Sequence, residues 1–146
     1  MNSIVLLTAA DLPQALAIEQ RSHAFPWSAN TFASNQGERF LNLACHQRGQ
    51  LVAFAITQQV LDEATLFNIA VDPDYQRQGI ARALLTELVS QLEARGVLTL
   101  WLEVRESNHR AIALYEAVGF NAVTVRKNYY PTTDGREHAL IMALPL

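Results

Sequence analysis

The segment best suited to bind an anion is residues 69–82, Ile-Ala-Val-Asp-Pro-Asp-Tyr-Gln-Arg-Gln-Gly-Ile-Ala-Arg. An apolar run typical of a strand ends in it, and a long helical pattern begins near Ile80. The first backbone N–H groups of a helix have no partner within it and lie at the positive end of its dipole, so they attract anions. Gly79 permits a close approach of the backbone, and Arg77 and Arg82 add positive charge. A pyrophosphate fits this chemistry.

The same segment is also compatible with an ordinary loop between a buried strand and a helix. A Gly-x-Ala at a helix start is a short pattern, and its spacing matches neither the dinucleotide-binding glycine fingerprint nor the Walker lysine loop. Taken alone, the segment predicts no more than some phosphate-bearing ligand.

Two other residues have side chains that can transfer protons. Glu103 interrupts the apolar strand pattern of residues 98–104, and partial desolvation beside Trp101 would make its carboxylate a stronger base. The alternative is an exposed glutamate at the end of a strand, paired with Arg105. Tyr115 lies on the apolar side of a predicted helix, where it is either a packed core tyrosine or a proton donor.

Apolar periodicity predicts the elements that must position these residues. Helices interspersed among strands indicate an α/β or α+β fold with a mixed sheet. Strands are predicted at residues 4–7, 40–46, 51–61, 64–71, 98–104, 123–127 and 138–144, and helices at 11–23, 29–35, 80–95 and 108–118.

Composition excludes several classes of protein. The 146 residues are half hydrophobic and contain no linker, which predicts a single domain over residues 1–146. The net charge of −3 argues against direct nucleic-acid binding by the whole domain. No apolar run suits a signal peptide or a membrane span, and the lone Cys45 reads as a core residue, so we expect a cytoplasmic protein. The four histidines are scattered, so we expect no metal.

Two motifs resemble signatures of the GNAT superfamily of acyl-CoA-dependent N-acetyltransferases. Gln76-x-x-Gly79-x-Ala81 is similar to its Q/R-x-x-G-x-G/A motif, with an allowed Ala where many members have Gly. Residues 108–120, Asn-x-x-Ala-x-x-x-Tyr-x-x-x-Gly-Phe, resemble the second signature. Their order and pairing favour an acyl-CoA ligand over other phosphate compounds.

The resemblance implies a GNAT fold, a mixed sheet of about seven strands splayed between the fourth and fifth, with about four helices. Acetyl-CoA would lie in the splay as co-substrate, with its pyrophosphate on the helix start and its pantetheine arm paired like a strand. Asn108 would cap a helix, and whether it also contacts the cofactor stays open. The implied cofactor-binding residues are Ile69, Ala70, Val71, Arg77, Gln78, Gly79, Ile80, Ala81, Arg82 and Asn108.

Residues 23–28, 101–105 and 126–131 resemble the GNAT enzymes that acetylate the N-terminal alanine of ribosomal proteins. This implies that Glu103 is the general base, directly or through a water, and that Tyr115 is the general acid. A thiol pKa of about 8.5 and a phenol pKa of about 10 would make that last proton transfer modest in energy. The loops with Phe25, Trp27, Tyr129 and Tyr130 would border the acceptor groove.

The predicted partner is therefore the N-terminus of a small-subunit ribosomal protein. An α-amino group, with a pKa of about 7.7–8.0 against about 10.4 for lysine, is easier for a modest carboxylate base to use. Two alternatives remain: a GNAT enzyme that acetylates protein lysines or a small amine, and a non-catalytic module that binds acetyl-CoA.

Overall fold

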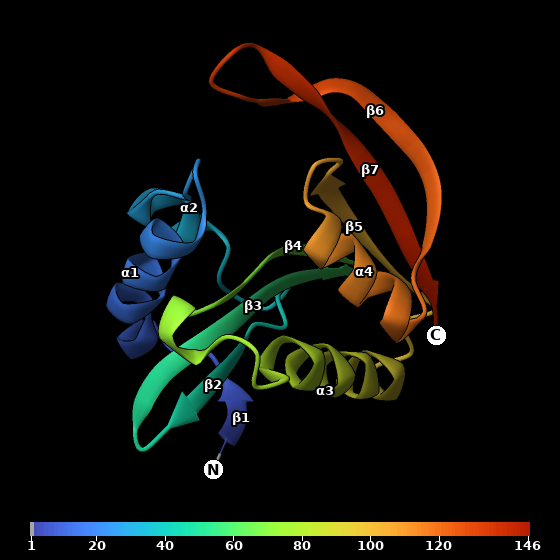
Figure 1. Ribbon diagram of the computed structural model, residues 1–146. Coiled ribbons are helices and arrows are strands. Elements are labelled where there is room, and N and C mark those ends of the chain that lie inside the picture. Colours follow the sequence, from blue (N-terminus) through green and yellow to red (C-terminus); the bar gives the residue numbers. More distant parts are fainter. Residues whose placement is uncertain (1) are drawn as a thin grey trace.

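The computed structural model describes residues 2–146, and its elements follow the predicted order (Figure 1). Seven strands form one mixed sheet, accompanied by four α-helices and two short 3-10 turns (Ala9–Asp11 and Pro73–Tyr75). The strands are β1 (Asn2–Leu6), β2 (Leu43–Gln47), β3 (Gln50–Val60), β4 (Glu63–Val71), β5 (Thr99–Arg105), β6 (Asn121–Pro131) and β7 (Arg136–Pro145). The helices are α1 (Leu12–Ser22), α2 (Ala29–Ser34), α3 (Ile80–Ala94) and α4 (His109–Val118).

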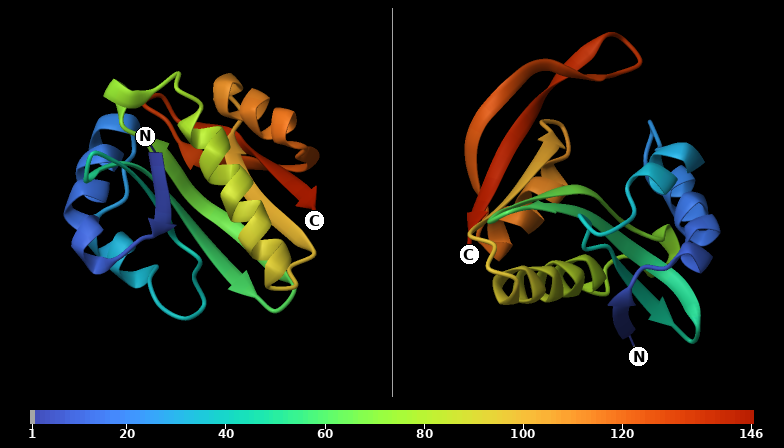
Figure 2. Two further views of the ribbon diagram at one scale, coloured as in Figure 1. Left: turned by 90° about the horizontal axis from the view of Figure 1, so that it is seen from below. Right: turned by 180° about the vertical axis from the view of Figure 1, so that it is seen from behind.

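The sheet has the order β1-β2-β3-β4-β5-β7-β6, and β4 and β5 are its parallel neighbours. Helices α1 and α2 pack on one face of the sheet, where Phe32 contributes to a core cluster with Phe54 and Ile56. Helices α3 and α4 cover the other face, and Leu88 and Cys45 share the larger cluster there. Because both faces are covered, β3 is buried along most of its length (Figure 2).

Helix α3 shows why the sequence pattern was sufficient for this element. Its buried side chains recur at helical spacing and form one apolar stripe facing the sheet. The helix ends before Gly96, whose φ of +80° is a left-handed conformation that favours glycine. The buried stripe consists of Ile80, Leu84, Leu85, Leu88 and Leu92.

Several predicted strand boundaries differ from the observed ones. Strand β2 begins at Leu43 rather than residue 40, because Phe40 forms only an isolated bridge to Gln58. Strands β6 and β7 are longer than the predicted 123–127 and 138–144. Nearly all of β6 is exposed, and its register shifts twice, so neither burial nor a two-residue period marks its ends in the sequence.

Candidate active site

The sheet opens between β4 and β5. These strands pair from Glu63 with Thr99 to Leu66 with Leu102. Beyond that point β4 continues along β3, whereas β5 continues along β7, so the two halves of the sheet curve apart in Figure 1. The splay predicted from the family resemblance is confirmed. One backbone edge of Ile69, Ala70 and Val71 faces this opening, because β3 pairs with the other edge.

Helix α3 begins beside the end of β4 with its N-terminal amides free of a side-chain cap. Gly79 is the N-cap residue, with a φ of +74°, and Arg77 before it also has a positive φ of +64°. The first bond of the helix runs from the Ala83 N–H to the Gly79 carbonyl. The N–H groups of Ile80, Ala81 and Arg82 precede this bond and have no acceptor within the helix. An anion can therefore accept hydrogen bonds from them.

Gly79 gives a direct test of this anion site. Replacing it with alanine should weaken acetyl-CoA binding by about tenfold. The left-handed turn costs an L-residue about 1–2 kcal/mol, so the free variant would leave this conformation and would have to regain it on binding. Gly96→Ala is the matched control, since it imposes a similar φ of +80° at the other end of α3. Calorimetric titration should show lost affinity for the first variant alone; equal affinity in both would exclude the turn as a binding site.

Asn108 is the N-cap of α4, because its Oδ1 accepts a hydrogen bond from the Ala111 N–H at 3.2 Å. The capping role expected from the sequence is therefore confirmed. Its contact with the cofactor stays a prediction. The side chain of Gln78 is directed elsewhere, since its Oε1 accepts from Gln47 Nε2 at 3.2 Å, so any cofactor contact of Gln78 would use its backbone.

Glu103 lines a cavity of about 390 Å³ between the α1–α2 loop, β4 and the β6–β7 hairpin. Three of the four aromatic residues predicted to bind the acceptor line it as well, while Phe25 lies beside it against Arg105. We call this space the aromatic cavity. Its lining residues are Trp27, Asn35, Thr65, Leu66, Phe67, Glu103, Tyr129 and Tyr130.

The Glu103 carboxylate is partly exposed and paired with Arg126, whose Nη1 lies 2.8 Å from Oε1. The alternative partner considered from the sequence, Arg105, instead forms an ion pair with Glu137 at 3.3 Å. Glu103 pairs with Arg126 because Arg126 on β6 reaches across β7: Glu103 lies in register with Ile141, and Arg126 with Ala139, two residues along β7. Strand alternation alone does not reveal this neighbour. A carboxylate that is accessible and held by one partner can still accept a proton from a ligand in the cavity.

Tyr115 is buried in α4, and its ring makes an edge contact with Phe120 at 5.6 Å between centroids. Among the described residues, Thr57 Oγ1 is the sole fully buried side-chain polar atom without a partner. The Tyr115 hydroxyl has no protein hydrogen bond in that same set, so it must keep some access to solvent. Tyr115 is therefore both a packed core residue and a hydroxyl available to a ligand.

Burial raises the pKa of Tyr115 to about 12, and the neighbouring Tyr130 adds to this effect. Burial, followed by the charge of Glu103, also raises the pKa of Tyr130 to about 12. The three groups therefore lie in one electrostatic neighbourhood. The ordinary phenol pKa of about 10 expected from the sequence is too low. Because its pKa is raised, Tyr115 gives up its proton to a thiolate less readily than an ordinary phenol would.

The raised pKa of Tyr115 predicts how turnover depends on pH above neutrality. A phenol with a pKa of about 12 stays protonated well above neutrality, so turnover should rise as the amine deprotonates and then stay level to about pH 10. Initial rates at saturating substrates, with protein integrity checked at each pH, measure this. A decline with an apparent pKa near 10 or below that disappears in Tyr115→Phe would contradict it.

Other predicted features fall outside this region. Cys45 is buried in the core, and burial raises the pKa of its thiol, which suits an inert residue. Within residues 2–146, no cluster of His, Cys, Asp and Glu is arranged to hold a metal ion. None of the helices described for that span is long and apolar enough to cross a bilayer.

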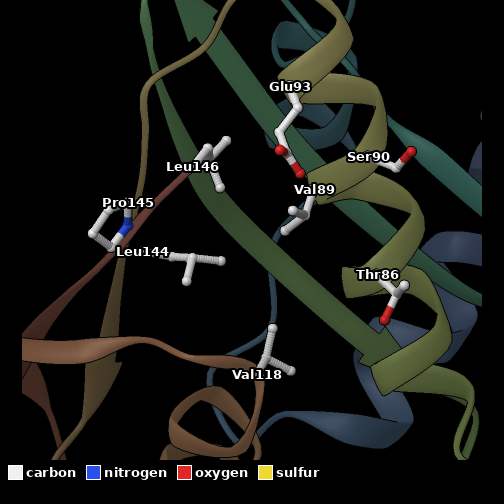
Figure 3. A pocket seen from close by; sticks show the side chains of 8 residues that line it. All are labelled: Thr86, Val89, Ser90, Glu93, Val118, Leu144, Pro145 and Leu146. Atoms are coloured by element: carbon white, nitrogen blue, oxygen red, sulfur yellow. The ribbon is translucent and has the colours of Figure 1, made fainter.

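A second cavity, of about 410 Å³, lies between α3, the end of α4 and the C-terminal segment (Figure 3). Apolar side chains such as Val89 and Leu144 point into it, and Glu93 is the charged residue at its border. It contains none of the predicted site residues and brings no acid and base together.

Several residues of the site have no individual signal in the sequence. Asn35, Thr65, Leu66 and Phe67 line the aromatic cavity through tertiary placement. Arg126 belongs to the segment 126–131 that carried the closer family resemblance, and this was the available indication of its importance. The buried Glu19 was also missed: its carboxylate accepts from the Trp27 N–H at 2.9 Å and from Asn68 Nδ2 at 3.0 Å, and it fixes the loop that carries Trp27.

Comparison with known proteins gives consistent matches along the chain. The Acetyltransferase (GNAT) family profile matches residues 6–120. The [Ribosomal protein bS18]-alanine N-acetyltransferase of Escherichia coli K12 is 70% identical over 146 residues, which are 100% of this chain and 99% of that protein. The crystal structure of the ribosomal-protein-S18-alanine N-acetyltransferase from Escherichia coli superposes with a TM-score of 0.96 at 71% identity, covering 99% of this chain and 94% of that one.

A more distant structure shares the fold. Arabidopsis thaliana NAA60 in complex with acetyl-CoA has a TM-score of 0.89 at 18% identity, covering 100% of this chain and 99% of that one. At this level of identity the likeness concerns the arrangement of helices and strands alone.

Proposed function

Because the chain belongs to the Acetyltransferase (GNAT) family, we propose that it transfers the acetyl group of acetyl-CoA to the N-terminal amino group of a protein. The proposed acceptor is the N-terminal alanine of the small-subunit ribosomal protein bS18. The observation that carries this proposal is the full-length similarity to the Escherichia coli enzyme that acts on that alanine. The aromatic cavity beside Glu103 supports it with a site of suitable chemistry.

The splay and the start of α3 provide the binding site for acetyl-CoA in this proposal. The pyrophosphate accepts the free N–H groups of Ile80, Ala81 and Arg82, and the exposed side chain of Arg77 adds charge. The pantetheine arm runs along the open backbone edge of Ile69–Val71 and pairs with it as a further strand would. Asn108 contributes at the start of α4, about two turns before Tyr115 on the same helix. This arrangement directs the thioester toward the aromatic cavity.

The reaction requires an attack of a neutral amine on the thioester carbonyl. The amine nitrogen forms the new C–N bond, Glu103 takes its proton directly or through a water, and the C–S bond breaks. The departing thiolate receives a proton from Tyr115, giving free CoA and the acetylated N-terminus. Because the pKa of Tyr115 is about 12, we expect it to hydrogen-bond the thiolate first and to complete the transfer as the sulfur gains charge.

An N-terminal amine suits this site better than lysine does. With a pKa of about 7.7–8.0, roughly a tenth of N-termini are neutral at pH 7, whereas about one lysine in a few thousand is. The Glu103 carboxylate is already paired with Arg126, so the reaction gains from an acceptor amine that is easy to deprotonate. The aromatic walls can pack against the first residues of an extended peptide.

A panel of acceptors tests the proposal. Peptides that begin with alanine should be acetylated faster than peptides with a blocked N-terminus and an internal lysine, and faster than polyamines. Mass spectrometry of ribosomal proteins from cells lacking this protein should show bS18 with a free N-terminal alanine. Preference for lysine or a polyamine, or an acetylated bS18 in those cells, would contradict the proposed acceptor. Acetyl-CoA binding without any transfer would indicate a non-catalytic module.

A further inference from the structure

Arg105, the last residue of β5, contacts the α1–α2 loop and the β6–β7 hairpin, the segments on either side of the aromatic cavity. Its guanidinium carbon lies 4.9 Å from the centroid of the Phe25 ring and 4.6 Å from that of Tyr130. Phe25 belongs to the α1–α2 loop, and Tyr130 lies near the end of β6. The guanidinium therefore lies over one aromatic ring from each of these two segments, and both distances are in the range of cation–π attraction.

Polar contacts fix the same guanidinium in its plane. Arg105 Nη1 donates to the Pro131 carbonyl at 2.7 Å and pairs with Glu137 Oε2 at 3.3 Å. The other oxygen of Glu137 accepts from the Ser107 N–H at 3.1 Å, so the carboxylate is anchored to the segment before α4. The Arg105 and Glu137 side chains are 25% and 16% exposed, which limits solvent screening of the pair. Polar contacts and the two aromatic rings together thus fix the position of the Arg105 guanidinium.

The contacts continue from Arg105 to the proposed base. The rings of Tyr130 and Tyr129 meet edge to face at 5.0 Å, and the guanidinium of Arg126 lies 4.1 Å from the Tyr129 centroid. Arg126 in turn pairs with Glu103. A displacement of Arg105 would therefore disturb the aromatic wall that faces Glu103.

We propose that Arg105 is a positioning residue for the acceptor, because it joins the α1–α2 loop to the β6–β7 hairpin across the aromatic cavity. The inference rests on the proposed function in so far as that cavity receives the acceptor. Arg105 contacts none of the reacting atoms; it sets the separation of the two walls that hold the peptide. A planar guanidinium is needed for this, since an ammonium group cannot lie flat over two rings and also donate in its plane.

The first experiment separates the two substrates kinetically. Arg105→Ala should raise KM for an alanine-starting peptide about tenfold, as expected for the loss of two partly desolvated cation–π contacts. KM for acetyl-CoA and the turnover at saturating peptide should stay near their wild-type values. Arg105→Lys should give an intermediate peptide KM. Arg95→Ala, at the exposed C-terminal end of α3, is the matched control and should leave all three parameters unchanged.

A double-mutant cycle tests the contact itself. Phe25→Ala should raise the peptide KM. Adding it to Arg105→Ala should have little further effect, because both substitutions remove the same contact between Arg105 and Phe25. Trp27→Ala is the control partner in the cycle, since Trp27 lines the same cavity but makes its aromatic contact with Phe32, edge to face at 5.2 Å between centroids. In the Trp27→Ala/Arg105→Ala double variant, the fold-increase in peptide KM should equal the product of the two single-variant increases.

An unchanged peptide KM in Arg105→Ala would overturn the inference, as would independent effects of Arg105 and Phe25 or an equal rise in KM for acetyl-CoA. If Arg105→Ala fails to fold, Arg105→Lys and Phe25→Ala can be used instead to compare the KM for the peptide with the KM for acetyl-CoA. Should the wild type prefer a lysine peptide, the proposed acceptor fails, and the KM comparison with that peptide still tests Arg105.

Discussion

Glu103→Gln should reduce turnover by about 10²–10⁴-fold while leaving acetyl-CoA affinity unchanged. The amide has nearly the same shape and can still accept a hydrogen bond from Arg126, but it cannot take the proton of the attacking amine. Steady-state rates with an alanine-starting peptide, together with calorimetric titration of acetyl-CoA, measure the two quantities. The combination of lost turnover and retained affinity is what distinguishes a base from a binding residue.

Glu63→Gln is a suitable control for this substitution. Glu63 is an exposed carboxylate at the start of the neighbouring strand β4, and its Oε1 accepts from Trp101 Nε1 at 3.2 Å. It lies outside the aromatic cavity, so turnover should remain near that of the wild type. Unchanged turnover in Glu103→Gln would remove Glu103 from the mechanism, and a large loss of thermal stability in that variant would indicate a structural role instead.

Tyr115→Phe should lower turnover by at least about 10²-fold with little change in thermal stability. Phenylalanine keeps the ring and its edge contact with Phe120. The hydroxyl has no partner among the described side chains, so its removal leaves no buried group unsatisfied. Turnover and the melting temperature, measured on the same preparation, separate the catalytic role from the core role.

The opposite result would assign Tyr115 to the core. A large loss of stability with normal turnover in the folded fraction would mean that the leaving thiolate needs no acid from this residue. Tyr75→Phe is the matched control, since Tyr75 also packs against the larger core cluster but belongs to the turn before α3. It reports what the loss of a phenol hydroxyl does elsewhere in the same core.

Features of the site that depend on neighbouring positions in the chain were predicted from the sequence. Glycine at position 79 indicated a special backbone conformation, and its φ is +74°. Asparagine at 108 indicated a helix cap, and its side chain accepts a hydrogen bond from the Ala111 N–H three residues on. These are interactions within one turn, so local composition is sufficient to specify them.

Contacts between distant positions were not predictable in the same way. Glu103 was expected either to be desolvated beside Trp101 or to pair with Arg105, yet its partner is Arg126, 23 positions along the chain. The pairing depends on the register of β6 against β7, which lies between β5 and β6 and whose pairing with β6 shifts twice. A strand whose side chains are nearly all exposed leaves no alternation from which to read this register.

The sequence by itself determined the order of elements, the buried stripe of α3, the glycine turn before α3 and, through two motifs, the family. Periodicity and capping are properties of short segments, which explains why the predictions that depend on them agree with the structure. The tertiary structure alone decided the aromatic cavity, the contacts of Arg105 with Phe25 and Tyr130, and the pKa of Tyr115. Each of these depends on how far β4 and β5 separate and on which side chains then enclose the space, and long-range packing sets both.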